Sequence, residues 1–406
     1  MLGACGGASE SHPPADGGTP PDDVDYLTEE RLGTTASFLA APELEGRNEG
    51  TAGHETARAY VIEQLSACGV QPAVGNGFEQ PIATGNGVNV LGRIAGTSSE
   101  LGERHVLVGA HYDHLGVNGG QIYPGAGDNA AAVAILIGVA CELAEHPVAR
   151  SVLVASWDSE EPPAYLTNAM GSEFYAANPT VPLDRIDVAI ALDLVGIDMW
   201  PGFQGHVVCG AELSPEVAAV VDAAAVPEGL LARRGGLHLV QELVTGGTMK
   251  WSDYAAFLDR SRPVLFFSDG TNKNYHEPSD TFATLDLPKM RREALYLHDI
   301  MVRLAASAAN PTFDAAGSNY RLDATMALEM LDWALAPTSG LVATLGLTET
   351  SRADLELDRA AVIAVKAALD GGGQPTAAQI EDLRRGVQRI MCLAGTMYTQ
   401  SMCHLM

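Results

Sequence analysis

The sequence predicts an α/β protein with a mostly parallel mixed sheet, flanked by helices and followed by a C-terminal helical extension. Short apolar runs alternate with helical patterns through the middle of the chain, which is typical of a largely parallel sheet with helices on its faces. Hydrophobic residues make up 47% and charged residues 18% of the 406 residues, so a sizeable core can form. From residue 312 onward, helical patterns continue without strand patterns.

The amino-terminal residues 1–24 are rich in Gly, Pro, Ser and Asp, so we expect a disordered tether. Its start, Leu2-Gly3-Ala4-Cys5, resembles the lipobox of bacterial lipoproteins, although the basic and apolar part of a signal peptide does not precede it. A truncated signal would make the protein an exported lipoprotein, periplasmic or at the cell surface, with a lipid anchor at Cys5. A plain tail with an incidental cysteine is the alternative.

The middle of the chain, residues 25–310, is predicted to form one catalytic domain. Six apolar runs predict strands at 88–94, 105–110, 151–157, 188–192, 206–209 and 264–267. Helical patterns predict helices at 28–40, 52–68, 129–145, 170–177, 214–225, 251–259 and 286–307. In an open α/β sheet, ligands bind outside the carboxyl ends of the strands, so site residues are expected there.

Residues 311–406 are predicted to form a helical C-terminal extension. Apolar spacing recurs from Met326 to Ala334 and from Leu357 to Val365, and a last helix is expected to begin near Pro375-Thr376. The extension carries no obvious chemistry in its sequence.

Charge and composition exclude some functions. The formal charge of −27 and the pI near 4.6 exclude a general nucleic-acid binder, because such a surface is repelled by phosphates. The most apolar stretch, Ala130–Cys141, is shorter than the ~20 residues of a membrane-spanning helix, so no transmembrane span is expected. Six cysteines without a Cys-x-x-Cys pair give neither a disulfide scaffold nor a structural zinc site.

Three of the cysteines, Cys68, Cys141 and Cys209, are interpreted as buried thiols. Cys392 and Cys403 can pair across a turn if the compartment is oxidising.

Histidines and carboxylates follow the predicted strand ends. The groups are His111-Tyr112-Asp113-His114, Gly127-Asp128-Asn129, Asp158-Ser159-Glu160-Glu161, Asp193 and Tyr275-His276-Glu277-Pro278-Ser279-Asp280. Imidazole with several carboxylates suits zinc or a similar divalent ion. Two histidines and three acidic ligands, one of them shared, can hold two ions ~3.5 to 4 Å apart. Of the neighbours Glu160 and Glu161, one can act as base and the other as ligand, and spacing alone does not assign them.

These five segments, in this order, resemble metallopeptidase family 28 over about residues 25–310. The family comprises di-zinc aminopeptidases related to glutamate carboxypeptidase, the transferrin receptor and glutaminyl cyclases. The resemblance implies the zinc-peptidase, aminopeptidase-like fold and two Zn²⁺ per chain. It implies that the first zinc is held by His111, Asp128 and Asp193, and the second by Asp128, Glu161 and His276.

The resemblance also implies the remaining roles. Glu160 would be the general base that deprotonates a zinc-bridged water, Asp113 would orient His111, and Tyr275 would stabilise the oxyanion. The loop after Glu161, with Pro162-Pro163, resembles a subgroup in which an insertion lies at the mouth of the site.

Neighbouring residues are given ordinary structural roles. His114 is expected to be a loop histidine, Ser252 to cap a helix, Asp280 to brace the His276 loop, and Asp158 to be solvated or structural.

The function predicted from these residues is a metal-dependent aminopeptidase acting on a peptide substrate. A carboxypeptidase or dipeptidase on the same metals is an alternative, and it would need a basic residue such as Arg233, Arg234 or Lys273 for the substrate carboxylate. A second alternative is a glutaminyl cyclase-like acyltransferase that uses a single zinc ion. A non-catalytic receptor is disfavoured, because all of the implied ligands are present. The sequence does not indicate the oligomeric state.

Overall fold

We describe a computed structural model of the chain, which covers residues 24–83, 85–243, 249–317, 320–396 and 403. Its strands are β1 (Gln71–Pro72), β2 (Glu79–Pro81), β3 (Val88–Ile94), β4 (His105–His111), β5 (Gly116–Asn118), β6 (Gln121–Tyr123), β7 (Ser151–Trp157), β8 (Ile186–Leu192), β9 (Gly205–Cys209), β10 (Leu231–Gly235) and β11 (Val264–Ser268). Its α-helices are α1 (Glu29–Leu39), α2 (Ala52–Ala67), α3 (Ala131–Glu145), α4 (Gly171–Ala177), α5 (Pro215–Ala223), α6 (Leu237–Glu242), α7 (Tyr254–Leu258), α8 (Leu287–Ala306), α9 (Tyr320–Ala334), α10 (Leu341–Thr344), α11 (Glu349–Asp370) and α12 (Ala377–Ala394).

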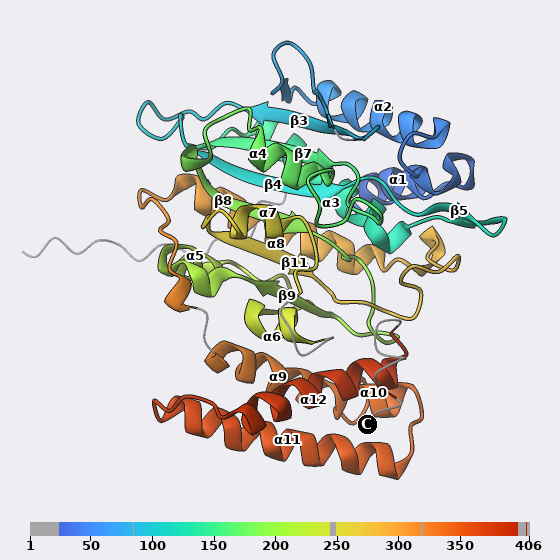
Figure 1. The fold of residues 1–406 in the computed structure, drawn as a ribbon, viewed down its shortest axis with the longest axis vertical. Coiled ribbons are helices and arrows are strands. Elements are labelled where there is room, and N and C mark those ends of the chain that lie inside the picture. The colour runs from blue at the N-terminus through green and yellow to red at the C-terminus, as the bar shows by residue number, and fades with distance from the viewer. Residues whose placement is uncertain (1–23, 84, 244–248, 318–319, 397–402, 404–406) are drawn as a thin grey trace, which may run out of the picture.

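A mixed sheet runs through the molecule in the order β1-β3-β7-β4-β8-β11-β9-β10, with β2 beside β3 (Figure 1). The central strands β7, β4, β8 and β11 are parallel neighbours, and β9 pairs parallel with β10. Strand β3 runs antiparallel to β7, and β9 runs antiparallel to β11. The predicted fold class is confirmed, and each of the six predicted strands is present.

Helices cover both faces of this sheet. The largest core lies between the sheet and α1, α3 and α8, and a second core lies on the other face under α4 and α7. With its preceding turn, α3 spans Ala126–Glu145 and is long and apolar enough to cross a membrane, contrary to the shorter stretch expected from the sequence. Its most apolar 18 residues are buried inside the protein, so the core accounts for the apolar character of the segment.

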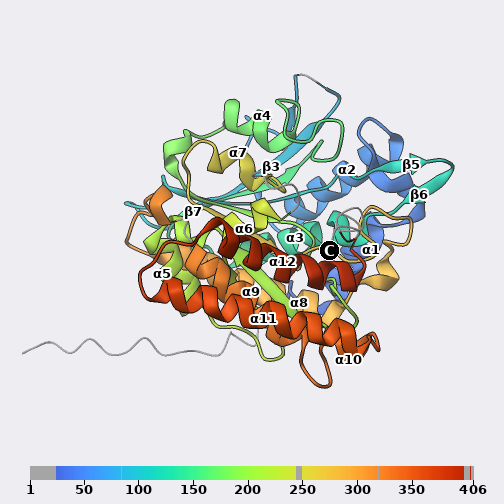
Figure 2. The ribbon, with the colours of Figure 1, turned by 60° about the horizontal axis from the view of Figure 1, so that its bottom comes forward.

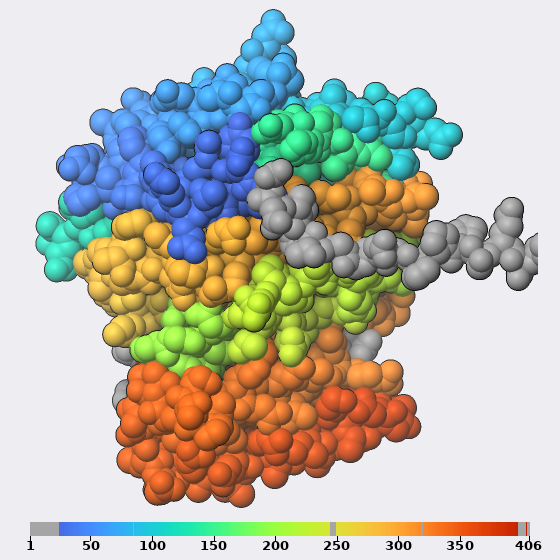
Figure 3. Space-filling model, turned by 180° about the vertical axis from the view of Figure 1, so that it is seen from behind, coloured from blue at the N-terminus to red at the C-terminus, as the bar shows by residue number. Residues whose placement is uncertain are grey.

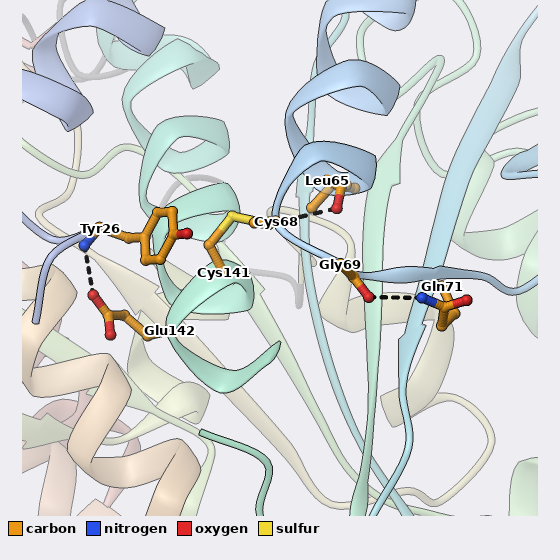
Figure 4. The surroundings of a disulfide bond; sticks show 7 residues. All are labelled: Tyr26, Leu65, Cys68, Gly69, Gln71, Cys141 and Glu142. Atoms are coloured by element: carbon orange, nitrogen blue, oxygen red, sulfur yellow. Dashed lines mark hydrogen bonds between the residues drawn. A yellow bond between two sulfur atoms is a disulfide. The ribbon is translucent and has the colours of Figure 1, made fainter. Parts of the chain in front are cut away.

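A disulfide joins α2 to α3. Cys68, directly after α2, is bonded to Cys141 in α3, with 5.3 Å between their Cα atoms (Figure 4). The interpretation of these two residues as free thiols is therefore wrong. It failed because residues that are 73 positions apart are brought together only by the packing of α2 on α3. Cys209 is a buried free thiol, as expected, and Cys392 pairs with Cys403.

The C-terminal helices cover the β10 edge of the sheet. Helix α9 packs on β10, and α9, α11 and α12 pack on one another as a layer below the sheet (Figures 1 and 3). Helix α12 begins at the predicted place, where Thr376 and Gln379 form a capping box. A third core fills this layer and includes Trp200 and Phe203 from the sheet side.

Two elements near this edge were not predicted. Strand β10 has the sequence LARRG, which has no apolar run, and α6 is a six-residue helix placed where the sequence gave no assignment. The predicted tether and Cys5 lie outside the described residues, and the domain boundary at residues 310 and 311 stays a prediction.

Candidate metal centre

The predicted site residues come together at one edge of the sheet. His111 ends β4, Glu160 and Glu161 follow β7, and Asp193 follows β8. Because these strands are parallel neighbours, their carboxyl ends deliver the side chains to one place. Asp128 joins them from the turn before α3, and His276 from the loop after β11.

The five implied ligands form two groups that share Asp128. In the first group, His111 Nε2 lies 3.3 Å from Asp128 Oδ1 and 3.6 Å from Asp193 Oδ1. In the second, His276 Nε2 lies 3.1 Å from Asp128 Oδ2 and 3.2 Å from Glu161 Oε2. The two oxygens of Asp128 therefore face different groups, which is the arrangement that a bridging carboxylate requires.

The donor atoms of both groups fit a divalent ion. His111 Nε2, His276 Nε2 and Asp193 Oδ1 are buried, and none makes a hydrogen bond to any described residue. Buried polar atoms without partners are costly, because they have given up their hydrogen bonds to water. Imidazole nitrogens and carboxylate oxygens that converge in this way are the ligands zinc prefers.

The crowding of charges shifts the pKa values of both groups. Burial lowers the pKa of His111, but the surrounding carboxylates, Glu160 first, outweigh it and raise that pKa well above its ordinary value. Burial also opposes protonation of His276, yet Asp128 and Glu161 raise its pKa to about 10. Burial would raise the pKa of Asp128, but the nearby imidazoles of His111 and His276 outweigh burial and hold that pKa well below its usual range. Positive charge is thus strongly favoured here, as in a site built for cations.

Glu160 lies at the edge of the first group. Its Oε2 is 3.9 Å from His111 Nε2, and the nearest oxygens of Asp128 and Asp193 are both closer to that nitrogen. Burial raises the pKa of Glu160 well above its ordinary value. The positive charge on His111 opposes this rise, and the negative charges of Asp193 and Glu161 add to it. A buried carboxyl beside the cluster, with a raised pKa, has the properties of a proton carrier.

Asp113 holds the backbone that carries both glutamates. Its Oδ1 accepts from Glu160 N and its Oδ2 from Glu161 N, each at 3.1 Å. Its contact with His111 is looser, since Asp113 Oδ1 is 3.6 Å from His111 Nδ1. Asp113 therefore braces the glutamate pair in addition to lying behind His111, as the resemblance implied.

Asp280 braces the Asp128 turn, although it was expected to brace the His276 loop on which it lies. Its carboxylate accepts from Gly127 N at 2.9 Å and from Asp128 N at 3.1 Å. This contact fixes the loop of one group to the turn that supplies the shared carboxylate.

His114 is more closely involved than its expected role as a loop histidine. It is fully buried, and its Nδ1 lies 2.7 Å from Glu161 Oε1 and 3.9 Å from Asp128 Oδ2. With these two carboxylates it forms a further cluster in which one donor atom from each residue lies within 4.8 Å of the others. Its place three residues after His111, in the same strand-end loop, was the available signal.

Arg47 is a second residue that the sequence did not single out. Its buried guanidinium donates to the carbonyl oxygens of Tyr112 and Gly125, at 2.9 and 3.0 Å, and to two more carbonyls. Burial lowers the pKa of Arg47 to about 10, although Asp113 and Asp128 act against this. The guanidinium therefore places positive charge behind the carboxylates and ties the two ligand loops together.

Of two structural interpretations, that of Asp158 is confirmed in its structural form, and that of Ser252 needs correction. Asp158 is fully buried, and its carboxylate is held by His54 Nε2 at 2.9 Å and Tyr112 OH at 2.7 Å, so it is structural and not solvated. Ser252 does not cap a helix through its side chain: α7 begins at Tyr254, and its N-cap residue Asp253 makes no side-chain cap bond. Burial raises the pKa of Asp253 to about 7.

The basic residues considered for a substrate carboxylate lie elsewhere. On β10, Arg233 pairs with Glu329 at 3.2 Å and Arg234 with Asp222 at 2.7 Å, while Lys273 is exposed. None of the three lines the cavity next to the metal groups.

A third cluster, His206, Asp269 and Glu293, also has metal-ligand geometry. It already contains a cation, because the buried ammonium of Lys289 lies 3.1 Å from Asp269 Oδ2 and 3.9 Å from Glu293 Oε1. We therefore interpret it as a buried ionic network that supports the segment after Asp193, where Gly196 N donates to Glu293 and Ile197 N to Asp269.

Tyr275 lines the cavity beside the second group. Its ring stacks on the imidazole of His276, with 3.9 Å between the centroids. Its implied role at the oxyanion stays a prediction, as do the individual roles of the other site residues.

The comparisons agree with this geometry. The sequence model of peptidase family M28 matches residues 89–301. The uncharacterized protein YfbL of Escherichia coli K12 is 31% identical over 204 residues, and the match covers 46% of this chain and 62% of that relative. The chain thus spans less than two thirds of its relative's length.

Solved structures with the same fold include enzymes of two kinds. An aminopeptidase from Aneurinibacillus sp. strain AM-1 has a TM-score of 0.54 at 13% identity, covering 71% of this chain and 96% of that one. LapB from Legionella pneumophila also has a TM-score of 0.54, at 16% identity, covering 71% and 76%. A glutaminyl cyclase from Porphyromonas gingivalis has a TM-score of 0.53 at 16% identity, covering 68% and 98%. At such identities the likeness shows the fold alone.

Proposed function

Because this chain belongs to peptidase family M28, a family of metal-dependent hydrolases, we propose that it is an aminopeptidase that removes the first residue of a peptide. The observation that carries the proposal is the position of Asp128 between two imidazole–carboxylate groups, whose inward nitrogens, His111 Nε2 and His276 Nε2, have no hydrogen-bond partner among the described residues. His111, Asp128 and Asp193 would hold one zinc ion, and Asp128, Glu161 and His276 the other. The count of two ions is part of the proposal.

When bound, the ions would polarise the scissile carbonyl and make a water more acidic. Glu160 accepts the proton of the attacking water and passes it to the nitrogen of the leaving amine. The hydroxyl of Tyr275 donates to the oxygen on which negative charge develops. Asp113 keeps the carboxylates of Glu160 and Glu161 in separate positions through their backbone N–H groups.

The charge around the cavity supports an aminopeptidase over a carboxypeptidase. Its lining includes Asp128, Glu160, Glu161, Asp193 and Asp269, and no described Lys or Arg side chain lines it. Acidic groups attract the ammonium of a free amino terminus, whereas a substrate carboxylate needs a cation. Arg233 and Arg234 are engaged in their own ion pairs at the sheet edge.

The experiment compares two adjacent glutamates. Glu160→Gln should lower kcat by about 10²- to 10⁴-fold on an aminoacyl-anilide and leave the metal content unchanged, because a proton carrier is lost. Glu161→Gln should lower the metal content itself. Metal is measured by plasma mass spectrometry and hydrolysis with and without a chelator.

Three outcomes would count against the proposal. A fully active Glu160→Gln variant would remove the proton-transfer role. Equal hydrolysis of a substrate with an acetylated amino group would remove the aminopeptidase assignment. One zinc per chain, with cyclisation of an N-terminal glutamine and no anilide hydrolysis, would favour the glutaminyl cyclase-like acyltransferase.

We also propose that the protein is exported and anchored through Cys5. The disulfides Cys68–Cys141 and Cys392–Cys403 support this, since disulfides persist in oxidising compartments. Mass spectrometry of the amino-terminal peptide from a membrane fraction tests it, and an unmodified Cys5 in a soluble fraction would contradict it.

A further inference from the structure

The cavity that begins at the metal groups continues away from them as an apolar space. Its volume is about 160 Å³, and one end is formed by Asp128, Glu161 and His276. The other end reaches between strands β11 and β9 and the C-terminal helices, which lie next to α6 in Figure 2. The metal groups and the helical extension thus share one cavity.

The C-terminal helices supply one wall of this space. Met326 and Met330 of α9 and Val387 and Met391 of α12 line it. The sheet side contributes apolar residues that include Val207 and Phe266. The cavity is therefore enclosed by two separate parts of the chain, the sheet and the C-terminal helices.

The wall is fixed to the catalytic part by polar contacts. Gln388, next to Val387, donates to the carbonyl oxygen of Leu243. Asp323, one turn before Met326, accepts from Leu239 N at 3.0 Å. Leu239 belongs to α6, whose neighbours Val240 and Leu243 also line the cavity. These bonds hold α9 and α12 in a fixed place against the site.

We propose that the C-terminal helical extension determines substrate choice, and that the accepted substrates begin with a large apolar residue of the size of Leu, Met or Phe. This inference rests on the proposed aminopeptidase activity. The amino group faces the acidic end, and the side chain enters the apolar end against α9 and α12. An apolar cavity of ~150 Å³ is large enough to hold a benzene ring, so this one accommodates such a side chain.

The three methionines in the wall fit this use. Met is unbranched and polarisable, so it adapts to side chains of different outline. We therefore expect several large apolar residues to be accepted and discrimination to be strong against small or acidic ones. In an apolar pocket, each missing methylene costs ~10- to 200-fold in kcat/KM.

The test substitutes residues of the C-terminal extension so that one variant has a smaller cavity and the other a larger one. Val387→Phe fills it and should lower kcat/KM on Phe-anilide at least tenfold relative to Ala-anilide. Met391→Ala enlarges it and should move the preference toward a naphthylalanine substrate. The matched controls are Val362→Phe and Leu383→Ala, which alter buried residues of the same helical core that do not line the cavity. The controls should leave substrate preference unchanged.

The direction in which substrate preference changes separates loss of folding from a change in the pocket. A disordered extension would change the substrate preference of both cavity variants and both controls in the same direction. Equal preference in all five proteins, wild type included, would overturn the inference.

A binding measurement separates this inference from the proposed reaction. Calorimetry with butylamine, hexylamine and hexanoate reports the cavity without turnover. Two extra methylenes should strengthen binding by roughly 15-fold, and Val387→Phe should remove that gain. If wild type hydrolyses no anilide but still binds hexylamine more tightly than butylamine, the aminopeptidase proposal fails and only the apolar binding space remains. If wild type hydrolyses anilides without this gain in binding, the inference about substrate choice fails alone. Equal binding of hexanoate and hexylamine would overturn the inference.

Discussion

Replacing Lys289 with Met should strongly destabilise the protein, because the ammonium is a buried cation in contact with buried acids. Its Nζ lies 3.1 Å from Asp269 Oδ2 and 3.9 Å from Glu293 Oε1, and it donates to the carbonyl oxygen of Ile197. The Lys289 side chain has no exposed surface. Met fills most of the same space without the charge, so packing changes little and electrostatics change most.

The magnitude follows from which acid keeps its charge. Burial would raise the pKa of Asp269, but Lys289 outweighs it and holds that pKa below its usual range. Burial and the charge of Asp269 raise the pKa of Glu293 well above its usual range, which favours the neutral form of Glu293. The variant leaves the buried carboxylate of Asp269 without its ammonium partner, with His206 Nδ1 at 2.9 Å and the N–H of Ile197 at 3.1 Å still beside it. Removing one partner of a buried pair costs about 3–5 kcal/mol. For a chain of 406 residues that unfolds as one unit, that cost corresponds to a fall in Tm of roughly 4–6 °C.

The assay is thermal and denaturant unfolding of wild type, Lys289→Met and the double variant Lys289→Met/Asp269→Asn. The double variant should recover most of the lost stability, since the unpaired charge is gone. Surface Lys366, which pairs with Asp370 at the end of α11, is the matched control, and Lys366→Met should cost well under 1 kcal/mol. A change below about 2 °C in Lys289→Met, or a double variant as unstable as the single one, would refute the reasoning.

Three further predictions concern other parts of the structure. Asp113→Ala should weaken zinc binding by ~10- to 100-fold in chelator competition, because the glutamate backbone loses its brace; unchanged affinity would contradict that role. Burial raises the pKa of Asp323 from 3.8 to about 8, so the folded state holds a proton that the unfolded state releases. The unfolding free energy from urea titrations should therefore fall as the pH rises between those values. If the unfolding free energy of Asp323→Asn depends on pH in the same way, Asp323 is not the cause. Replacing Cys68 and Cys141 with Ser should lower the unfolding free energy by ~4 kcal/mol, given a sequence separation of 73; an unchanged Tm would show that the bond contributes nothing.

The sequence predicted which of the site residues lie together, because they follow the ends of buried strands. Val188–Leu192 is an uninterrupted apolar run, so its end, and hence the place of Asp193, could be found from composition alone. His111 and Glu160 follow two other runs of this kind, and parallel pairing brings their ends together. Hydrophobic periodicity locates the strands, and ligand sites of open α/β sheets lie at the carboxyl ends of the strands. These two facts were enough to predict that residues far apart in sequence lie close together.

The supporting residues were missed because their partners are distant. Lys289 and Glu293 are four apart on α8 and form a pattern typical of an exposed helical ion pair. Their burial depends on Asp269, which follows β11, and on the Ile197 segment, and no local pattern reports either. Arg47 is similar, because its partners are backbone carbonyls, which leave no mark in the sequence.

The wall of the cavity shows a further limit of periodicity. The apolar spacing of α12 predicts that the helix buries one face, but it does not say that Val387 and Met391 face a cavity while Leu383 faces α9 and α11. The family match ends at residue 301, before α9 begins at Tyr320, so the proposed chemistry and the proposed specificity lie in separate stretches of the chain. Substrate preferences of other family members therefore do not transfer to this protein. Deleting the extension would not test this point, because it would uncover Trp200 and Phe203, and only substitutions inside the wall can separate specificity from folding.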